Sequence, residues 1–256
     1  MRNYYYNKIA HDYHIKRKKP WKALENFLSY LAEKNYAFTG YSIDLGCANG
    51  RNFKLFKNSS NKLIGIDKSL EFLKIAHEEL NNSTQYSKID SNNIQLILGG
   101  LKHIPIRTSS IQNIFSIATI HHIKGKTERE KVITHISELL SKDGYFLPTV
   151  WRRWQKKFKT YFISDLIKRI FNPKYKKHKK ELKLNEFGDK FIPWTISKEK
   201  KTYNRFYHFF SKREVKKLLR IFKIKEFSMR GGSSNKDNFF ILAKNNSVLK
   251  KSSITS

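Results

Sequence analysis

Short apolar segments alternate with helical patterns along residues 41–150 of this sequence. The apolar segments are 41–45, 62–67, 93–98, 111–120 and 144–150. Amphipathic patterns at 69–80 and 127–140 separate several of them. Several segments are apolar at nearly every position, as in strands covered on both faces. The alternation therefore predicts an α/β fold in which a mostly parallel sheet lies between two layers of helices.

The turn after the first predicted strand, IDLGCANGRN, places an acid and two glycines close together in a chain of formal net charge +31. A second acid, Asp67, ends the next predicted strand. Ligands of doubly wound sheets bind at the carboxyl ends of the strands, and Gly46 and Gly50 let the backbone approach a ligand closely. We predict a nucleoside site, in which Asp44 favours a cationic ligand over a pyrophosphate and Asp67 accepts hydrogen bonds from ribose hydroxyls. A capped helix N-terminus without a ligand is the alternative.

The alternation stops at about 151 and returns after about 205. The intervening segment is basic and aromatic and contains one predicted helix, 161–171. Ser211 and Glu214 form a capping box for a later helix, and 223–229 and 238–244 predict an antiparallel pair that closes the sheet. We predict one domain over 1–245, with these parts: a basic and aromatic segment 1–35, a core 36–150, a basic insertion 151–205, a C-terminal helix and strand pair 206–245, and a disordered tail 246–256.

The charge is strongly basic, with 52 Lys and Arg against 21 Asp and Glu and a sequence pI near 10.1. The basic residues are clustered among aromatic ones at 14–20, 151–160 and 172–183, whereas 84–121 is nearly neutral. Such clusters suit a nucleic-acid backbone, because binding releases the counterions of the phosphates. The alternative is a Lys-, Asn- and Ile-rich composition shared by all proteins of the source.

The compartment is expected to be the cytoplasm. No stretch approaches the roughly 20 apolar residues that cross a bilayer, and residues 1–10 lack the apolar region of a signal peptide. Cys47 is the single cysteine, so the chain has neither an internal disulfide nor a cysteine cluster for zinc. We expect no membrane association and no metal.

The turn DLGCANG resembles the first motif of the class I S-adenosylmethionine-dependent methyltransferases, D-x-G-x-G-x-G, with Ala48 in the place of the middle glycine. The resemblance implies a Rossmann-like fold, with a seven-stranded mostly parallel sheet and a basic insertion after the fifth strand, and S-adenosylmethionine as cofactor. The cofactor-binding residues that it implies are Asp44, Gly46, Cys47, Ala48, Asn49, Gly50, Asp67, Lys68, Ser69 and Ser116.

Further segments resemble, in order along the chain, the tRNA wobble-uridine carboxymethyl methyltransferase family. They are KIAHDYHIKRKKPWKALENFL (8–28), the stretch 116–151, GDKFIPW (188–194), YNRFYHFF (203–210) and NKDNFFILAK (235–244). The resemblance implies methyl transfer to the carboxylate of 5-carboxymethyluridine at the first anticodon position, and the tRNA anticodon stem-loop as partner. It also implies a small zinc-binding activator protein that covers an apolar edge of the sheet. The fourth predicted strand, with Ile104, Ile106 and Ile111, is the candidate surface, and packing in the core is the default alternative.

The catalytic residues that the resemblance implies are Arg17, His121, Asp189 and Asn238. Arg17 matches an arginine of the family and has the planar fork that grips a carboxylate. His121 is favoured over His122 because strand alternation lets only one of them face the cleft. We expect Asp44 and Asp67 to flank the cofactor in a crevice that also opens toward His121 and Arg17.

Asp189 would orient the base edge or a histidine, and Asn238, with Asp237, would complete the pocket. Each candidate has a structural alternative, namely a solvated basic stretch for Arg17, a strand-end cap for the histidines, a surface acid for Asp189 and a hairpin turn for Asp237 and Asn238. Trp151 and Trp194 could stack on a base or pack in the core.

The sequence departs from the family at Gly99, where relatives place an acid after the third strand, and in the length of the segment 152–187. The adenine contact therefore comes from elsewhere or is missing. Two other functions stay open: a methyltransferase for another RNA position or a small carboxylic acid, and a non-catalytic RNA-binding protein on a methyltransferase scaffold.

Overall fold

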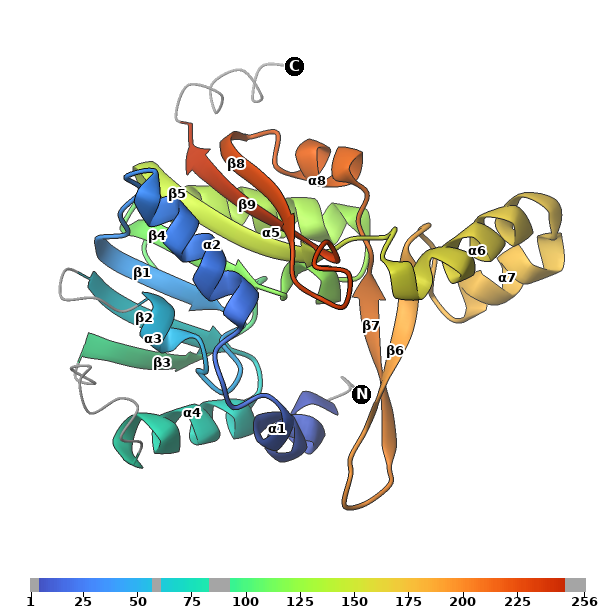
Figure 1. The fold of residues 1–256 in the computed structure, drawn as a ribbon, viewed down its shortest axis with the longest axis horizontal. Helices are drawn as coiled ribbons and strands as arrows, with labels where there is room; N and C mark the ends of the chain where they lie inside the picture. The colour runs from blue at the N-terminus through green and yellow to red at the C-terminus, as the bar shows by residue number, and fades with distance from the viewer. Residues whose placement is uncertain (1–4, 57–60, 83–92, 247–256) are drawn as a thin grey trace.

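A seven-stranded sheet forms the centre of the computed structural model, which describes residues 5–56, 61–82 and 93–246 (Figure 1). Its strand order is β3-β2-β1-β4-β5-β9-β8. The five strands from β3 to β5 pair in parallel, and β9 runs antiparallel to both of its neighbours. The bounds of these strands are β1 (Gly40–Leu45), β2 (Asn61–Asp67), β3 (Ile94–Leu98), β4 (Ile111–Ile117), β5 (Leu140–Trp151), β8 (Phe222–Arg230) and β9 (Asn238–Asn245). The predicted fold is confirmed.

Alternation along the strands divides the core between the two faces of the sheet. Ile43 and Ile114 point to the face covered by α5 (Lys126–Leu139) and α8 (Lys212–Leu218). Phe115 points to the opposite face, where it packs with α2 (Lys22–Glu33), α3 (Phe53–Phe56) and α4 (Leu70–Asn82). Figure 1 shows α2 and α5 on opposite sides of the sheet. Because both faces are covered, the central strands are apolar at nearly every position.

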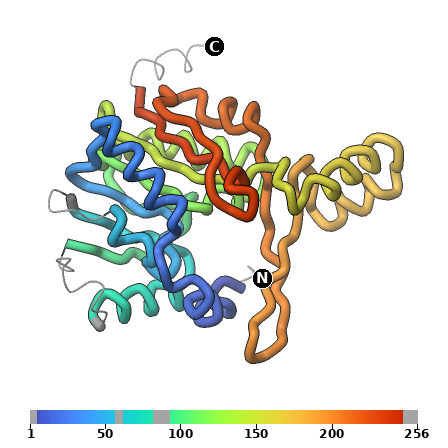
Figure 2. The backbone as a smooth tube through the Cα atoms, viewed as in Figure 1, coloured from blue at the N-terminus to red at the C-terminus, as the bar shows by residue number. Residues whose placement is uncertain are grey.

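Between β5 and α8 the chain builds two further units. After the turn η3 (Lys156–Phe158), the helices α6 (Lys159–Phe171) and α7 (Pro173–Glu181) form an arm that projects from the domain (Figure 1). The strands β6 (Asp189–Thr195) and β7 (Thr202–His208) then pair as an antiparallel hairpin. The hairpin passes beside α1 (Tyr5–Lys16), as the trace in Figure 2 also shows. The helix predicted at 161–171 is confirmed, and α1, α7 and the hairpin are additions to the prediction.

The helix starts test the predicted capping residues. Ser69 Oγ accepts a hydrogen bond from the Phe72 amide, and Ser211 and Glu214 make the predicted capping box. Helix α2 begins at Lys22, two residues after Pro20. Nearly all of the predicted tail 246–256 lies outside the described residues.

The prediction that the fourth strand, β4, forms the surface for an activator protein is wrong. β4 lies in the middle of the sheet, between β1 and β5, so it has no free edge. Ile104 and Ile111 are buried in the core, and Ile106 packs against the same cluster. The edges of the sheet are β3 and β8.

Candidate functional site

The glycine-rich turn lies where the strand order reverses, between β1 and β4. Gly46 has φ +77°, and a Cβ on it would clash with Thr119 Cγ2. Gly50 has φ +70°, and a Cβ there would meet the Phe53 ring at 2.5 Å. Ala48 also takes a positive φ, 49°, at the position where the resembling motif has glycine. The turn is thus held in a conformation that brings backbone close to the carboxyl ends of the strands.

Asp67 joins this turn to the end of β2. Its Oδ2 accepts a hydrogen bond from the Ala48 amide and its Oδ1 from the Ser69 amide, both at 2.9 Å. Burial raises the pKa of Asp67, and these backbone hydrogen bonds oppose the rise. Each carboxylate oxygen retains a lone pair, so Asp67 can still accept a hydrogen bond from a ribose hydroxyl.

Three further polar groups at this edge are buried without a partner. Among the described residues, Asp44 Oδ1, Asn49 Oδ1 and Ser116 Oγ have no hydrogen bond. Buried polar groups are normally satisfied, and unsatisfied acceptors clustered at a switch point indicate a ligand. Burial, and then the charge of Asp67, raises the pKa of Asp44 to about 8. A cationic group bound beside Asp44 would favour its ionised form, so these residues fit the sulfonium and amino groups of S-adenosylmethionine.

Helix α1 covers this site. Ser69 Oγ donates to Asn7 Oδ1 at 2.6 Å, and Asn49 Nδ2 donates to the Arg17 carbonyl at 3.1 Å. The ammonium of Lys68 lies 4.5 Å from the centre of the Tyr6 ring. Burial lowers the pKa of Lys68. The N-terminal segment therefore contacts Ser69, Asn49 and Lys68 of the predicted cofactor residues. Cys47 is buried, and burial raises the pKa of its thiol.

The two histidines lie in the short turn η2 (Ile120–His122), directly after β4. His121 stacks on the Tyr207 ring at 5.0 Å, and its Nδ1 accepts a hydrogen bond from the Trp151 amide at 3.4 Å. His122 Nδ1 lies 3.0 Å from the Phe206 carbonyl, to which it donates. Both histidines lie in this turn and not in a strand, with His121 buried and His122 partly buried, so the expectation that alternation along a strand separates them does not apply.

The surroundings of both histidines favour the neutral form of the ring. Burial, followed by the neighbouring His122, lowers the pKa of His121 well below its ordinary value. Burial also lowers the pKa of His122 to about 3. Both rings are neutral at physiological pH and can offer one donor and one acceptor each.

Asn238 pairs with Trp151, and the charge of Arg17 acts on Tyr207; both of these rings pack against His121. Arg17 is exposed, and its guanidinium donates to the Lys16 carbonyl at 2.9 Å. Asn238 Nδ2 donates to the Arg230 carbonyl across the β8–β9 connection. In the same connection Asp237 accepts hydrogen bonds from the Ser234 hydroxyl and amide. The structure brings Asp44 and Asp67 together, whereas Arg17 contacts solvent.

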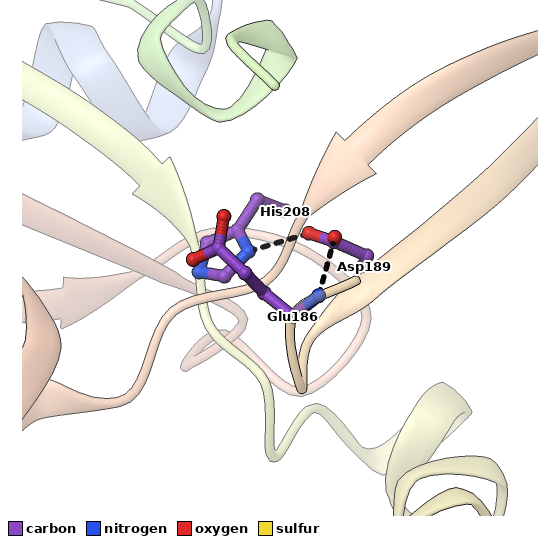
Figure 3. A group of neighbouring side chains, drawn as sticks. All are labelled: Glu186, Asp189 and His208. Atoms are coloured by element: carbon purple, nitrogen blue, oxygen red, sulfur yellow. Dashed lines mark hydrogen bonds and ion pairs between the residues drawn. The ribbon is translucent and has the colours of Figure 1, made fainter. Parts of the chain in front are cut away.

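Asp189 does orient a histidine, but the histidine is His208. Figure 3 shows the Asp189 carboxylate joined to both His208 and Glu186, with its Oδ1 2.8 Å from His208 Nδ1 and its Oδ2 accepting from the Glu186 amide. Ligand atoms of these three side chains lie within 4.8 Å of one another, a spacing that a metal ion could use. Arg129 donates to Glu186 at 2.5 Å and neutralises it. We therefore infer that Glu186, Asp189 and His208 hold the base of the hairpin together.

Residues of the hairpin complete the surroundings of the histidines, and sequence reasoning passed over them. Arg205 and Tyr207 both lie on β7 with one residue between them, so their side chains face the same side of the strand. Tyr207 packs against both histidines and against Trp151. The signal was present in YNRFYHFF, where Arg205 and Tyr207 flank Phe206 at the spacing of one face of a strand.

Comparisons with known proteins show what the chain is similar to. The model of the methyltransferase domain family matches residues 43–147. A tRNA (carboxymethyluridine(34)-5-O)-methyltransferase of Schizosaccharomyces pombe is 26% identical over 246 residues, which cover 94% of each chain. The enzyme of the same name from Saccharomyces cerevisiae is 27% identical over 66% of this chain and 54% of its own. The chain thus spans nearly all of one curated relative and about half of the other.

A solved structure shares the fold. A SAM-dependent methyltransferase of Methanosarcina mazei superposes with a TM-score of 0.65 at 16% identity, over 84% of this chain and 96% of that one. In the described residues no helix is both long and apolar enough to cross a membrane. The chain therefore carries a methyltransferase domain over residues 43–147, has the fold of S-adenosylmethionine-dependent methyltransferases, and resembles the tRNA wobble-uridine carboxymethyl methyltransferases.

Proposed function

We propose that the protein forms the methyl ester of 5-carboxymethyluridine at the wobble position of tRNA. The observation that carries the proposal is the extent of the similarity to the Schizosaccharomyces pombe enzyme, 94% of both chains. The methyltransferase model covers only the cofactor half, residues 43–147. The similarity continues through the hairpin and the C-terminal strands, which supply the residues beside the histidines.

The reaction makes modest chemical demands on the chain. When bound, S-adenosylmethionine supplies the methyl group, and its transfer to a carboxylate oxygen breaks the carbon–sulfur bond, leaves the electron pair on sulfur and moves no proton. A carboxylate is already ionised at neutral pH, so no strong base is needed. The neutral histidines suit this requirement, because they can position the acceptor without competing for a proton. Orientation and exclusion of water are the main contributions of the protein.

In this proposal Asp44, Asp67, Ser116 and the turn from Gly46 to Gly50 hold the cofactor. His121 contributes a hydrogen bond to the acceptor base or its carboxylate. Asp189 acts through His208 at the base of the hairpin, and Asn238 shapes the β8–β9 connection at the rim. Arg17 is placed on the surface where an RNA approaches the covered site.

Basic segments on either side of the site would hold the anticodon stem-loop. One is the N-terminal stretch 14–22, and the other runs from 151 to 183 and includes the arm of α6 and α7. Contacts from lysines to phosphates make binding strongly dependent on salt. The compartment of such an enzyme is the cytoplasm. A small zinc-binding activator, as the family resemblance implies, would cover one of the free edge strands, β3 or β8.

The test is an assay with purified protein on tRNA that carries 5-carboxymethyluridine, with and without a candidate activator, followed by nucleoside mass spectrometry. The expected product is the methyl ester at the wobble uridine. Methylation of a different acceptor, with no ester in any condition, would assign the enzyme to another RNA position or to a small acid. Binding of tRNA without measurable binding of S-adenosylmethionine would indicate a non-catalytic RNA-binding protein.

A further inference from the structure

Three arginines are buried in the described part of the chain, and one of them differs from the others. The guanidinium of Arg129 pairs with Glu186, and that of Arg153 pairs with Glu214 through two hydrogen bonds. Arg205 is 7% exposed and forms no ion pair with any described acid, and its Nε is buried without a hydrogen bond. Burying a charge without a partner is costly. An anion that is absent from the free protein would satisfy Arg205.

The guanidinium of Arg205 is held in place by aromatic rings. It lies 4.7 Å from the centre of the Trp194 ring and 5.2 Å from that of Tyr207. Such stacking fixes the plane of the guanidinium and leaves its N–H groups free at the edge. The nearby acid Asp12 is already engaged, because it accepts hydrogen bonds from Trp194, Lys16 and the Ser197 amide. The rigid fork of Arg205 is therefore available to a ligand.

The groups around Arg205 place its guanidinium on the side of the site where the methyl acceptor would bind. Tyr207, against which it stacks, contacts His121 and His122 at the carboxyl end of β4. The hydroxyl of Tyr6, which lies edge-on to His122, is a second buried polar atom without a partner. Burial is the main cause of the low pKa of both histidines, and the charge of Arg205 contributes to each. The surroundings are thus neutral and aromatic, with one cation, and they match a planar base that carries one negative group.

We propose that Arg205 binds the carboxylate of the acceptor nucleoside and so selects the carboxymethyl group over uncharged uridine derivatives. This inference rests on the proposed function and refines it. It assigns to Arg205 the part that sequence similarity assigned to Arg17. Arg17 is exposed and donates to a main-chain carbonyl, so it lacks the desolvated surroundings in which a charge-assisted hydrogen bond discriminates strongly. Arg205 has those surroundings.

The test compares the binding of two anticodon stem-loop RNAs in the absence of cofactor. One carries 5-carboxymethyluridine, and the other carries the neutral amide, 5-carbamoylmethyluridine. We expect the wild-type protein to prefer the carboxylate by about 10- to 100-fold, as for a charge-assisted bidentate contact. Arg205→Gln should reduce the preference to about onefold, and Arg205→Lys, which keeps the charge without the fork, should give an intermediate value. Arg220→Gln is the matched control, since its side chain is 64% exposed and far from the hairpin in sequence.

The outcomes separate this inference from the proposed function. If wild type forms the ester and Arg205→Gln keeps the full preference, Arg205 is not the anchor, although the function stands. If Arg17→Ala abolishes the preference while Arg205→Gln retains it, the anchor is Arg17. If wild type prefers the carboxylate through Arg205 but forms no ester, the inference stands and the proposed reaction is wrong. Should Arg205→Gln fail to fold by circular dichroism, the folded Arg205→Lys variant decides, and an unchanged preference in it would overturn the inference.

Discussion

Replacement of Asp44 by Asn should change how the stability of the cofactor-free protein depends on pH. Asp44 is buried, and burial together with the charge of Asp67 raises its pKa from 3.8 to about 8. The folded state therefore holds this proton more tightly than the unfolded state does. The stabilisation is complete at low pH and is lost as the pH rises toward 8, where the buried carboxylate ionises. The amide side chain of the Asp44→Asn variant has no such proton to lose.

The magnitude follows from the pKa. Between pH 6 and pH 9, the free energy of unfolding of wild type should fall by about 2 to 3 kcal/mol through Asp44, at about 1.4 kcal/mol per pH unit up to its folded pKa. Chemical denaturation at four pH values in this range, on wild type and Asp44→Asn, measures the difference. Because groups that do not interact with Asp44 titrate alike in both proteins, subtraction gives the contribution of Asp44 together with its coupling to Asp67. Asp143→Asn, at an acid whose side chain is 63% exposed, is the control and should show a constant difference.

The same comparison with the cofactor tests the charge complementarity of the site. Saturating S-adenosylmethionine places a cation beside Asp44 and favours the carboxylate, so the wild-type curve should become flatter with pH. Asp44→Asn should bind the cofactor more weakly, with a dissociation constant that no longer improves as pH rises to 8. Parallel stability curves for wild type and Asp44→Asn, without cofactor, would refute the assignment of a protonated, buried Asp44.

Other predictions address the turn, the hairpin and the RNA surface. Gly46→Ala should cost about 2 to 4 kcal/mol of stability from overpacking and backbone strain, because the new Cβ meets Thr119; urea unfolding measures it, and Gly100→Ala, with open space around its Cβ, should be far milder. Asp189→Ala should cost about 2 to 3 kcal/mol and leave cofactor affinity unchanged in calorimetry; full stability with lost turnover would instead indicate a direct contact with substrate. Replacing the exposed Lys176 and Lys177 by Gln should reduce the slope of log affinity for tRNA against log salt by about 1 to 2, and an unchanged slope would remove the arm from the RNA surface.

The sequence was sufficient for the sheet and for the cofactor turn. Strand positions followed from apolar segments, and their parallel pairing followed from the alternation with helices, because parallel strands need crossovers. Asp44 and Asp67 lie close together as expected, because residues at the carboxyl ends of neighbouring parallel strands meet at one edge of the sheet. These features depend on local patterns of a few residues.

The acceptor side was not predictable in the same way. The partners of Arg205 and Tyr207 come from α1, η2 and β6, so no local pattern indicates them. The sequence contains many arginines that look alike, and only burial and the absence of a counter-ion among the described residues distinguish Arg205 from Arg17. Likewise, Asp189 was expected to orient the base edge or His121, but the register of the hairpin sets it opposite His208.

Helix α1 connects the two halves of the enzyme. Its Asn7 is hydrogen-bonded to Ser69 beside the cofactor turn, while its Asp12 and Lys16 bond to Trp194 and Thr195 on the hairpin. A displacement of the helix that admits one ligand therefore also disturbs the contacts that position the other. Under the proposed function, occupancy of the two sites is then coupled by a single free energy, equal in both directions.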